Sequence, residues 1–192
     1  MTVAQPKLTT LTEFLQLPET EPALEFIHGQ IFQKPMPKGK HSRLQLKLSA
    51  AINQVTEATA VALALPELRC TFAERSFVPD IAVFRWERIP FDADGEVSNT
   101  FEASPDWVIE ILPPGQSQTK LTDKLLFCLQ HGAKLGWMID PEERAVICYM
   151  PDGLPSIHRG VELLPVLAEV ELPLTVESLF GWLKPEISSK PR

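Results

Sequence analysis

The sequence is poor in cysteine, and its three cysteines, Cys70, Cys128 and Cys148, lie far apart among apolar neighbours. Their number is odd, and no C-x-x-C pair or cluster of histidines accompanies them. The sequence therefore lacks the ligand spacing of a zinc site. We expect all three cysteines to be reduced and to pack in the core as small hydrophobic side chains.

Long apolar segments are also missing. The N-terminus has no basic region followed by an apolar stretch, and no segment approaches the roughly 18 apolar residues of a membrane span. We therefore expect a soluble, cytoplasmic protein. At 192 residues, of which 44% are hydrophobic, the chain has the size of one domain with a well-buried core. We expect this single domain to cover residues 1–192, with its core over residues 10–184.

Basic residues are fewer than acidic ones, 18 lysines and arginines against 25 aspartates and glutamates. The formal net charge is -7 and the isoelectric point is about 5.2. This balance argues against a protein that coats nucleic acid non-specifically, because such binding depends on lysine and arginine displacing counterions from phosphate. It does not exclude a nuclease, which can concentrate positive charge locally while acidic residues hold a metal ion.

Helical patterns occur in four segments of the chain. Thr10 and Glu13 have the spacing of a capping box at a helix N-terminus. Two longer segments have apolar residues at helical spacing, and the second of them ends at Gly132, a favourable residue just after a helix. We expect a short helix that ends near Pro18, an amphipathic helix over residues 41–57, and further helices over residues 117–131 and 174–183.

Short segments rich in valine, isoleucine and aromatic residues predict strands between these helices. His28 and Gly29 separate two of them and suit the two-residue turn of a β-hairpin. The expected strands cover residues 24–27, 30–33, 68–73, 81–85, 107–112, 136–140 and 145–149. This order of elements predicts a mixed α/β (α+β) fold.

Two carboxylates stand out, because each lies in or beside an apolar segment. Asp80 directly precedes the expected strand over residues 81–85, and Glu110 interrupts the apolar run over residues 107–112. Burying an unpaired carboxylate costs several kcal/mol, so Glu110 needs an ion partner, a metal ion or a raised pKa. Magnesium takes one or two carboxylates in proteins, so the two acids together predict a magnesium site. A buried structural ion pair is the alternative for Glu110.

Lys124 is the candidate for the positive charge that phosphodiester hydrolysis needs beside a metal ion. On a helical wheel it falls inside the apolar arc from Phe127 through Leu125 to Leu126. A lysine on the inward side of this helix could bring its ammonium over Asp80 and Glu110. Alternatively, its stem covers apolar surface while its ammonium stays in water.

Four segments together resemble the Uma-two family of restriction endonuclease-like proteins, which belongs to the PD-(D/E)XK nuclease superfamily. The resemblance covers most of the chain, from residue 24 to the closing helix. It is carried by Val-Pro-Asp80, Pro-Asp-Trp-Val-Ile-Glu110-Ile-Leu, Asp-Lys124-Leu-Leu-Phe-Cys-Leu-Gln-His-Gly and Leu-Gly-Trp137-Met-Ile-Asp140-Pro.

The resemblance implies a restriction endonuclease-like fold, with a central mixed β-sheet flanked by helices, and a metal-dependent cut of DNA. The positions that match the acidic and lysine residues of the family are Glu25, Asp80, Glu110 and Lys124. The superfamily motif has lysine two residues after the glutamate, where this chain has Leu112. Lys124 on the following helix therefore takes the lysine role, as in the family pattern.

Other polar residues are weaker candidates. Glu25 could bind a second metal ion or orient water, but a glutamate on a half-exposed strand is usually just solvated. Lys38, Lys40 and His41 could contact DNA phosphate at a helix N-terminus, or form a plain surface loop. Asp140 is expected to cap a turn before Pro141, and Asp106 is a poorer metal candidate than Glu110.

The leading hypothesis is therefore a DNA endonuclease that depends on Mg²⁺, or on Mn²⁺, held by Asp80 and Glu110. The rival is a nuclease-fold protein without catalysis that binds DNA or another protein, favoured by the acidic charge and by the turn Pro113-Pro114-Gly115 after the glutamate strand. RNA hydrolysis is a third hypothesis. By analogy with restriction enzymes that pair two active sites, a homodimer is also expected.

Overall fold

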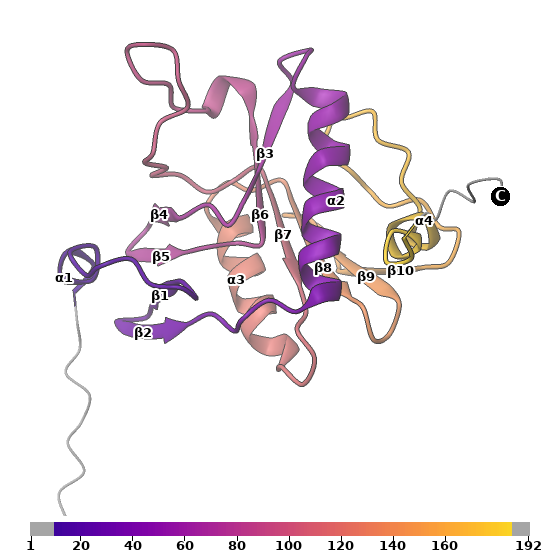
Figure 1. The fold of residues 1–192 in the computed structure, drawn as a ribbon, viewed down its shortest axis with the longest axis horizontal. Helices are drawn as coiled ribbons and strands as arrows, with labels where there is room; N and C mark the ends of the chain where they lie inside the picture. The colour runs from indigo at the N-terminus through magenta and orange to yellow at the C-terminus, as the bar shows by residue number, and fades with distance from the viewer. Residues whose placement is uncertain (1–9, 186–192) are drawn as a thin grey trace, which may run out of the picture.

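A six-stranded mixed sheet forms the centre of the structure, a computed structural model that describes residues 10–185 (Figure 1). The strand order is β10-β9-β8-β7-β6-β3, in which β7 and β8 are parallel and the other neighbours antiparallel. The strands are β3 (Ala62–Pro66), β6 (Ile81–Arg85), β7 (Trp107–Ile111), β8 (Leu135–Asp140), β9 (Ala145–Tyr149) and β10 (Ser156–Arg159).

A smaller antiparallel sheet has the strand order β2-β1-β5-β4. Its strands are β1 (Leu24–Ile27), β2 (Gln30–Gln33), β4 (Cys70–Phe72) and β5 (Arg75–Phe77). His28 and Gly29 connect β1 to β2, and both have positive φ, 51° and 74°. Positive φ at both central residues is the backbone conformation that a tight hairpin turn requires, so the predicted hairpin is confirmed.

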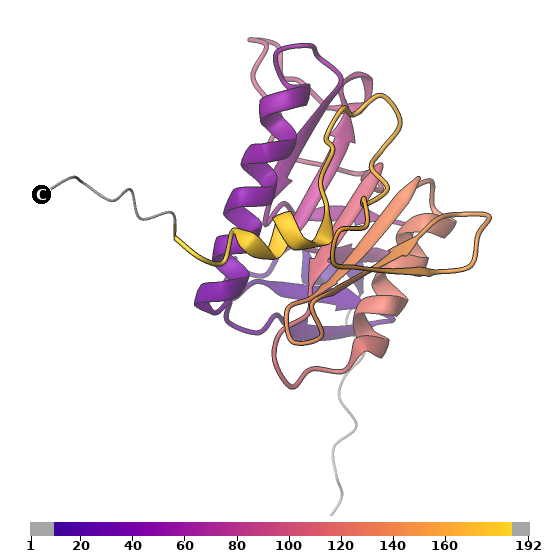
Figure 2. The same ribbon diagram turned by 90° about the vertical axis from the view of Figure 1, so that its right-hand side faces the viewer.

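Helices cover both faces of the six-stranded sheet. Figure 2 shows α2 and α3 on opposite sides of the strands, with α4 beside α2. Leu44, Leu48 and Ile52 of α2 pack against Ile109 and the other odd-numbered residues of β7, whereas α3 packs against Val108. Glu110 therefore faces α3, because alternate residues of a strand point to opposite faces. The helices are α1 (Leu11–Phe14), α2 (Gly39–Thr56), α3 (Gln118–Gln130), α4 (Val176–Gly181) and the 3-10 turn η1 (Trp86–Arg88).

The mixed α/β fold class predicted from the sequence is confirmed, and so are the four expected helices and the longer strands. Strands β6 and β9 have the predicted bounds, and the three cysteines are buried and free, as expected. None of the helices within residues 10–185 is long and apolar enough to cross a bilayer.

Three strands were not predicted, β3, β5 and β10. The sequence Ala-Leu-Ala-Leu-Pro of β3 has none of the β-branched residues that favour strands, and it ends in proline. β5 has three residues, and β10 is a largely exposed edge strand without apolar alternation. Leu126 was also misplaced in the apolar arc of α3. It is 43% exposed, and the buried side of the helix is formed by Leu121, Lys124, Leu125, Phe127 and Cys128.

Candidate active site

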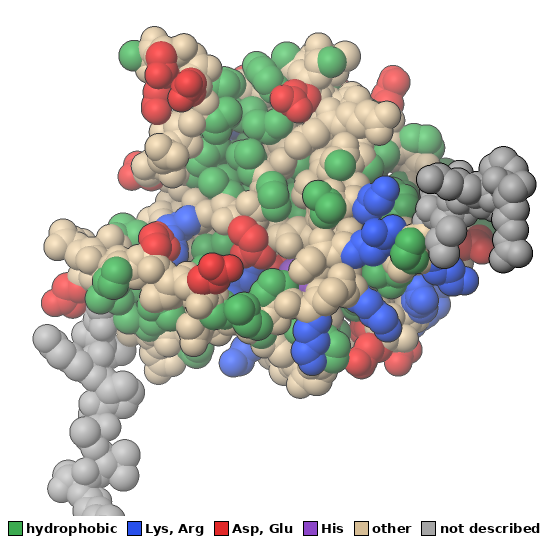
Figure 3. Space-filling model, in the orientation of Figure 1, with side chains coloured by type: hydrophobic (Ala, Val, Ile, Leu, Met, Phe, Trp, Pro, Cys, Tyr) green, Lys and Arg blue, Asp and Glu red, His purple; other side chains and the backbone are tan. Residues whose placement is uncertain are grey.

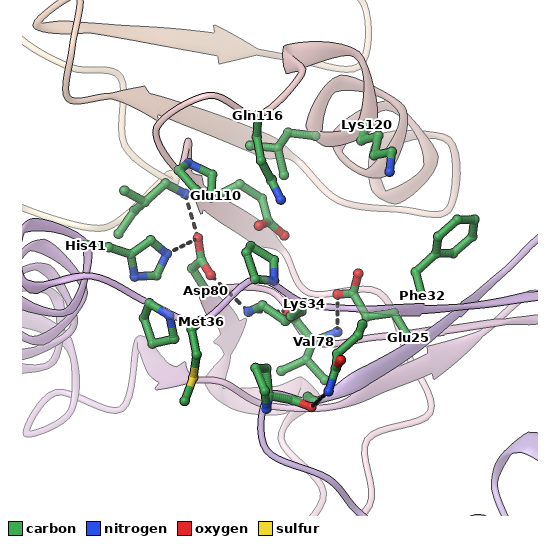
Figure 4. Close-up of a pocket in the computed structure, with 18 of the residues that line it drawn as sticks. Glu25, Phe32, Lys34, Met36, His41, Val78, Asp80, Glu110, Gln116 and Lys120 are labelled. Atoms are coloured by element: carbon green, nitrogen blue, oxygen red, sulfur yellow. Dashed lines mark hydrogen bonds and ion pairs between the residues drawn. The ribbon is translucent and has the colours of Figure 1, made fainter.

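A cavity of about 1250 Å³ opens between the small sheet, the N-terminal end of α2 and α3. Asp80, Glu110, Lys124 and Glu25, which were predicted from widely separated parts of the sequence, all line it. Figure 4 shows the carboxylates of Glu25 on β1, Asp80 just before β6 and Glu110 on β7 turned toward this space. The structure therefore brings the four predicted residues into one cavity.

The sheet register places Asp80 beside Glu110. Strands β6 and β7 are antiparallel, and Ile81 lies opposite Ile109. One residue further along this ladder, Asp80 precedes Ile81 and Glu110 follows Ile109, so the two acids occupy facing positions. Residues that face each other across antiparallel strands have their Cβ atoms about 5 Å apart and point to the same face of the sheet. Both side chains are buried, with 3% and 2% of their surface exposed.

The carboxylate of Asp80 accepts three hydrogen bonds or ion pairs. Its Oδ1 lies 2.9 Å from Nζ of Lys34, and its Oδ2 lies 3.0 Å from Nε2 of His41. The backbone N–H of Ile111 also donates to Oδ2 at 2.7 Å. Figure 4 shows these partners converging on Asp80 from three directions. Asp80 is thus held rigidly in one orientation.

The ammonium of Lys34 has three oxygen acceptors. Besides Asp80, it donates to Oε2 of Glu67 and to the carbonyl of Val78, each at 2.9 Å. Gln45 of α2 holds the other oxygen of Glu67 at 2.9 Å. An ammonium has three N–H donors, so Lys34 is fully hydrogen-bonded within the protein.

Glu110 belongs to a second charged group, centred on Lys124. The ammonium of Lys124 lies 3.0 Å from Oε1 of Glu110 and 2.7 Å from Oε1 of Glu25. The ion pair with Glu110 lacks hydrogen-bond geometry, which leaves this buried oxygen without a hydrogen bond. Glu25 is 7% exposed and also accepts the backbone N–H of Val78 at 3.0 Å. It is therefore a paired residue of the cavity wall and not a solvated one.

Burial and neighbouring charge shift the two central carboxylates in opposite directions. Burial acts to raise the pKa of Asp80, but the hydrogen bond from His41 and the charge of Lys34 hold it well below its ordinary value. Burial raises the pKa of Glu110 to about 7, because the attraction of Lys124 is outweighed by desolvation together with the negative charges of Asp80 and Glu25. Neighbouring acids with separated pKa values are typical of functional sites.

The DNA-contact candidates at α2 have different surroundings. Lys38 and Lys40 are exposed and line the mouth of the cavity. His41 is 8% exposed and pairs with Asp80. Its pKa is raised, since the hydrogen bond and the charge of Asp80 together outweigh the effect of burial. His41 therefore lies in direct contact with Asp80, and the two lysines lie further out.

The two weaker carboxylate candidates have structural partners elsewhere. Asp140 accepts the backbone N–H groups of Glu142 and Glu143, both at 3.0 Å, which confirms the predicted turn cap. Asp106 pairs with Arg88 at 2.7 Å and accepts the backbone N–H of Arg85. Neither residue lines the cavity.

The cavity could hold a divalent cation through at most two protein carboxylates. Among residues 10–185, no three His, Cys, Asp or Glu side chains form a group that could hold a metal ion. Magnesium, however, keeps several waters and needs only one or two carboxylates. Asp80 and Glu110 supply hard oxygen ligands at the cavity floor. Oε1 of Glu110 lies 3.0 Å from the Lys124 ammonium, whereas its Oε2 has no hydrogen bond or ion pair within residues 10–185. These two residues could therefore hold the metal ion.

Sequence patterns missed Lys34, Glu67 and Gln45. Lys34 follows the strand β2 and Glu67 follows β3, so neither interrupts an apolar run in the way that Glu110 does. Each stands just after a short strand and next to a proline, Pro66 or Pro35, where a charged residue of a loop needs no special explanation. Their contact depends on the tertiary packing of segments 33 residues apart.

Comparisons with known proteins identify a family and a similar crystal structure. A family model, Uma2, described as "Putative restriction endonuclease", matches residues 11–179. The crystal structure of a "putative nuclease belonging to DUF820" from Anabaena variabilis ATCC 29413 is similar to this chain, with a TM-score of 0.89 and 50% sequence identity. The alignment covers 92% of this chain and 99% of that one. Among functionally curated proteins, none matches.

Proposed function

The chain belongs to the Uma2 family, described as putative restriction endonucleases, and from this premise we propose that it is a metal-dependent DNA endonuclease. The observation that supports the proposal is the facing pair of buried carboxylates, Asp80 and Glu110, at the floor of a large cavity. We infer that this pair holds Mg²⁺, with Mn²⁺ as the alternative. A metal ion bound there would supply Lewis-acid polarisation of the phosphate and a water molecule of lowered pKa.

In this proposal Lys124 stabilises the phosphate. Its ammonium donates a hydrogen bond to Oε1 of Glu25 at 2.7 Å and lies 3.0 Å from Oε1 of Glu110 without hydrogen-bond geometry, so it keeps donor capacity for a phosphate oxygen or a water molecule. The side chain is 6% exposed, so the field of its ammonium acts in a medium that screens charge weakly. Glu25 positions Lys124, and the Ile111 N–H and His41 position Asp80.

Basic residues at the cavity mouth and along the rest of α2 would bind the DNA backbone. Lys40, Arg43 and Lys47 recur at helical spacing on α2, which contains no acidic residue, and Lys38 precedes them. Figure 3 shows lysine and arginine side chains gathered over the region of α2 and α4, whereas acidic side chains gather over other parts of the same face. Such a local concentration can bind phosphate even though the net charge of the chain is -7.

Cleavage assays on supercoiled plasmid DNA test the proposal. We expect the wild type to nick or cut the plasmid with Mg²⁺ or Mn²⁺, and to lose this activity in EDTA. Asp80→Asn and Glu110→Gln should lower the cleavage rate by about 100-fold or more, since each removes a charge that supports the transition state. The proposal is wrong if neither metal ion supports cleavage, or if both variants cut like the wild type.

Asp123→Asn is the matched control. Asp123 also lines the cavity, but its carboxylate is half-exposed and pairs with Arg75 at 3.1 Å. We expect this variant to cut at a rate close to that of the wild type. The same assay with single-stranded RNA in place of plasmid DNA tests the third hypothesis, RNA hydrolysis.

A specific observation also favours the second candidate function, a nuclease-fold module that binds without cutting. Lys34 and His41 already neutralise Asp80, and Lys124 lies between Glu25 and Glu110. Together with Glu67, four carboxylates face three basic groups in the site, so little negative charge remains for a metal ion to neutralise. Such a module would bind DNA equally well in EDTA and in Mg²⁺, and would not cut it.

A further inference from the structure

We propose that Lys34 is the resident cation of Asp80, and that a divalent metal ion must displace its ammonium from this carboxylate in order to bind. The inference rests on the proposed function, because it takes Asp80 as a metal ligand. It assigns to Lys34, which the sequence patterns did not single out, control over the metal affinity of the site.

The contacts of the two buried lysines differ in a way that separates their roles. Lys34 uses all three of its N–H donors on protein oxygens, from Asp80, Glu67 and Val78, each at 2.9 Å. It therefore has no donor left for a phosphate oxygen. Within residues 10–185, Lys124 donates a hydrogen bond to Glu25 and pairs with Glu110 through charge alone, so it keeps donor capacity. Lys34 occupies an oxygen cage of the kind that a cation fills, whereas Lys124 can act on a substrate.

Asp80 has little capacity left for a metal ion while Lys34 is in place. Its Oδ2 accepts from both His41 and the Ile111 N–H, and its Oδ1 accepts from Lys34. Magnesium binds carboxylate oxygen at about 2.0–2.1 Å, whereas the Lys34 ammonium lies 2.9 Å from the same Oδ1. Two cations on one oxygen lie within a few ångströms of each other, where their repulsion is strong in a buried site. Binding of the metal ion and retention of this contact therefore exclude each other.

The displaced ammonium has another partner at hand. Glu67 is 43% exposed in its side chain, and Gln45 holds its Oε1 at 2.9 Å, which leaves Oε2 to Lys34. The stem of Lys34 is flexible and has four carbons. A shift of its ammonium from Asp80 toward Glu67 keeps one ion pair and the Val78 carbonyl, and it frees Oδ1 of Asp80. The fold therefore tolerates the exchange without leaving Lys34 unpaired.

Calorimetric titration with Mg²⁺ tests the exchange without any measurement of activity. Lys34→Met removes the competing ammonium, and Lys120→Met is its matched control. Lys120 lines the same cavity and lies 5.4 Å from the Phe32 ring, but within the described part of the chain it forms no ion pair with a carboxylate. We expect Lys34→Met to bind Mg²⁺ at least about tenfold more tightly than Lys120→Met, because it alone removes a charge in contact with the ligand.

A second measurement uses the wild type, so it does not depend on the folding of a variant. In protein with ¹⁵N-labelled lysine side chains, the ammonium of Lys34 should give an NMR signal, since it is buried and has three acceptors. The spectrum of Lys34→Gln assigns this signal. Addition of Mg²⁺ should shift or remove it in step with saturation of the site. An unchanged Lys34 signal at saturating Mg²⁺ overturns the inference.

The outcomes separate this inference from the proposed function. If the wild type binds Mg²⁺ and Lys34→Met binds it no more tightly than Lys120→Met, the inference is wrong and the metal site stands. If only Lys34→Met binds Mg²⁺, the inference is supported, while the proposed activity of the wild type is wrong. If no variant binds Mg²⁺, both are wrong.

Discussion

Glu110 combines three properties that are costly for a carboxylate. It is 2% exposed, it lies opposite the carboxylate of Asp80, and one of its buried oxygens accepts no hydrogen bond. Lys124 offsets part of this cost but leaves the pKa of Glu110 raised to about 7. Proteins retain such an arrangement where it supports a function, and here Oε2 of Glu110 has no hydrogen bond or ion pair within residues 10–185.

The raised pKa of Glu110 predicts a dependence of stability on pH. Because the folded pKa of about 7 exceeds the ordinary 4.5, the folded protein holds a proton that the unfolded chain releases between these pH values. The contribution of Glu110 to stability is therefore greatest below pH 4.5, and it is lost as the pH rises to 7.

Glu110→Gln removes this titration, so urea unfolding should show the variant gaining stability relative to the wild type between pH 4.5 and about 8. The gain should reach at most about 3 kcal/mol. His41, whose raised pKa acts in the same direction, is present in both proteins and cancels in the difference. A difference that stays constant over this pH range would show that Glu110 is ionised throughout.

Single residues also show what sequence can predict about a site. Asp80, Glu110 and Lys124 were identified because each places charge in or beside an apolar pattern, and all three line the cavity. Lys34 and Glu67 gave no such signal, since they stand just after strands and beside prolines, and they meet only through tertiary packing. Sequence patterns detect a buried charge where its neighbours are apolar, and they do not show which partners the fold brings to it.

At the scale of elements, α3 determines where Lys124 lies. Its buried side packs on β7 and β8, with Leu125 fully buried beside Lys124. Leu125 also lies 3.3 Å from the position that a Cβ would take at Gly136 of β8, so the helix approaches the sheet closely at this point. Because this packing is tight, Lys124 of α3 can take the role that the superfamily motif gives to a lysine on the strand of the glutamate, here β7.

Leu125→Ala should therefore weaken the protein by about 2–5 kcal/mol, the usual cost of truncating a buried leucine. Leu126→Ala is the matched control, since Leu126 is 43% exposed and its truncation should cost less than about 1 kcal/mol. Urea unfolding of both variants measures the difference. Equal effects would contradict the packing of α3 described above.

Elements with a clear sequence pattern could be predicted, whatever their length, and strands without one could not. α2 and β6 carry clear apolar patterns, and their observed bounds lie within two residues of the predicted ones. β3 has no β-branched residue, but it forms five register pairs with β6 and is stabilised by this pairing. Tertiary pairing overrides a weak local propensity, which a single sequence does not show.

At the scale of the whole molecule, charge is unevenly distributed. The net charge of the chain is -7, yet α2, which is 18 residues long, has basic residues and no acidic one. If this helix binds the DNA backbone, binding should weaken with salt, because each neutralised phosphate releases counterions.

The double variant Lys40→Gln, Lys47→Gln should lower the slope of log K against log salt by about 0.9 for each phosphate that the helix no longer neutralises. Fluorescence anisotropy of labelled duplex DNA at several salt concentrations measures this slope. As a control with the same change of charge, Lys134→Gln, Arg159→Gln alters two exposed residues outside the cavity. If the control lowers the slope equally, net charge and not α2 governs the binding.

The central claim is that Asp80 and Glu110 jointly hold a divalent cation. Anomalous diffraction from crystals of the wild type soaked in Mn²⁺ tests it most directly. The account predicts a manganese peak within about 2.5 Å of a carboxylate oxygen of each residue, near the coordination distances of hard cations, and no peak in Asp80→Asn crystals soaked in the same way. A wild-type map without a peak between these two carboxylates, at full occupancy of manganese elsewhere, would contradict it.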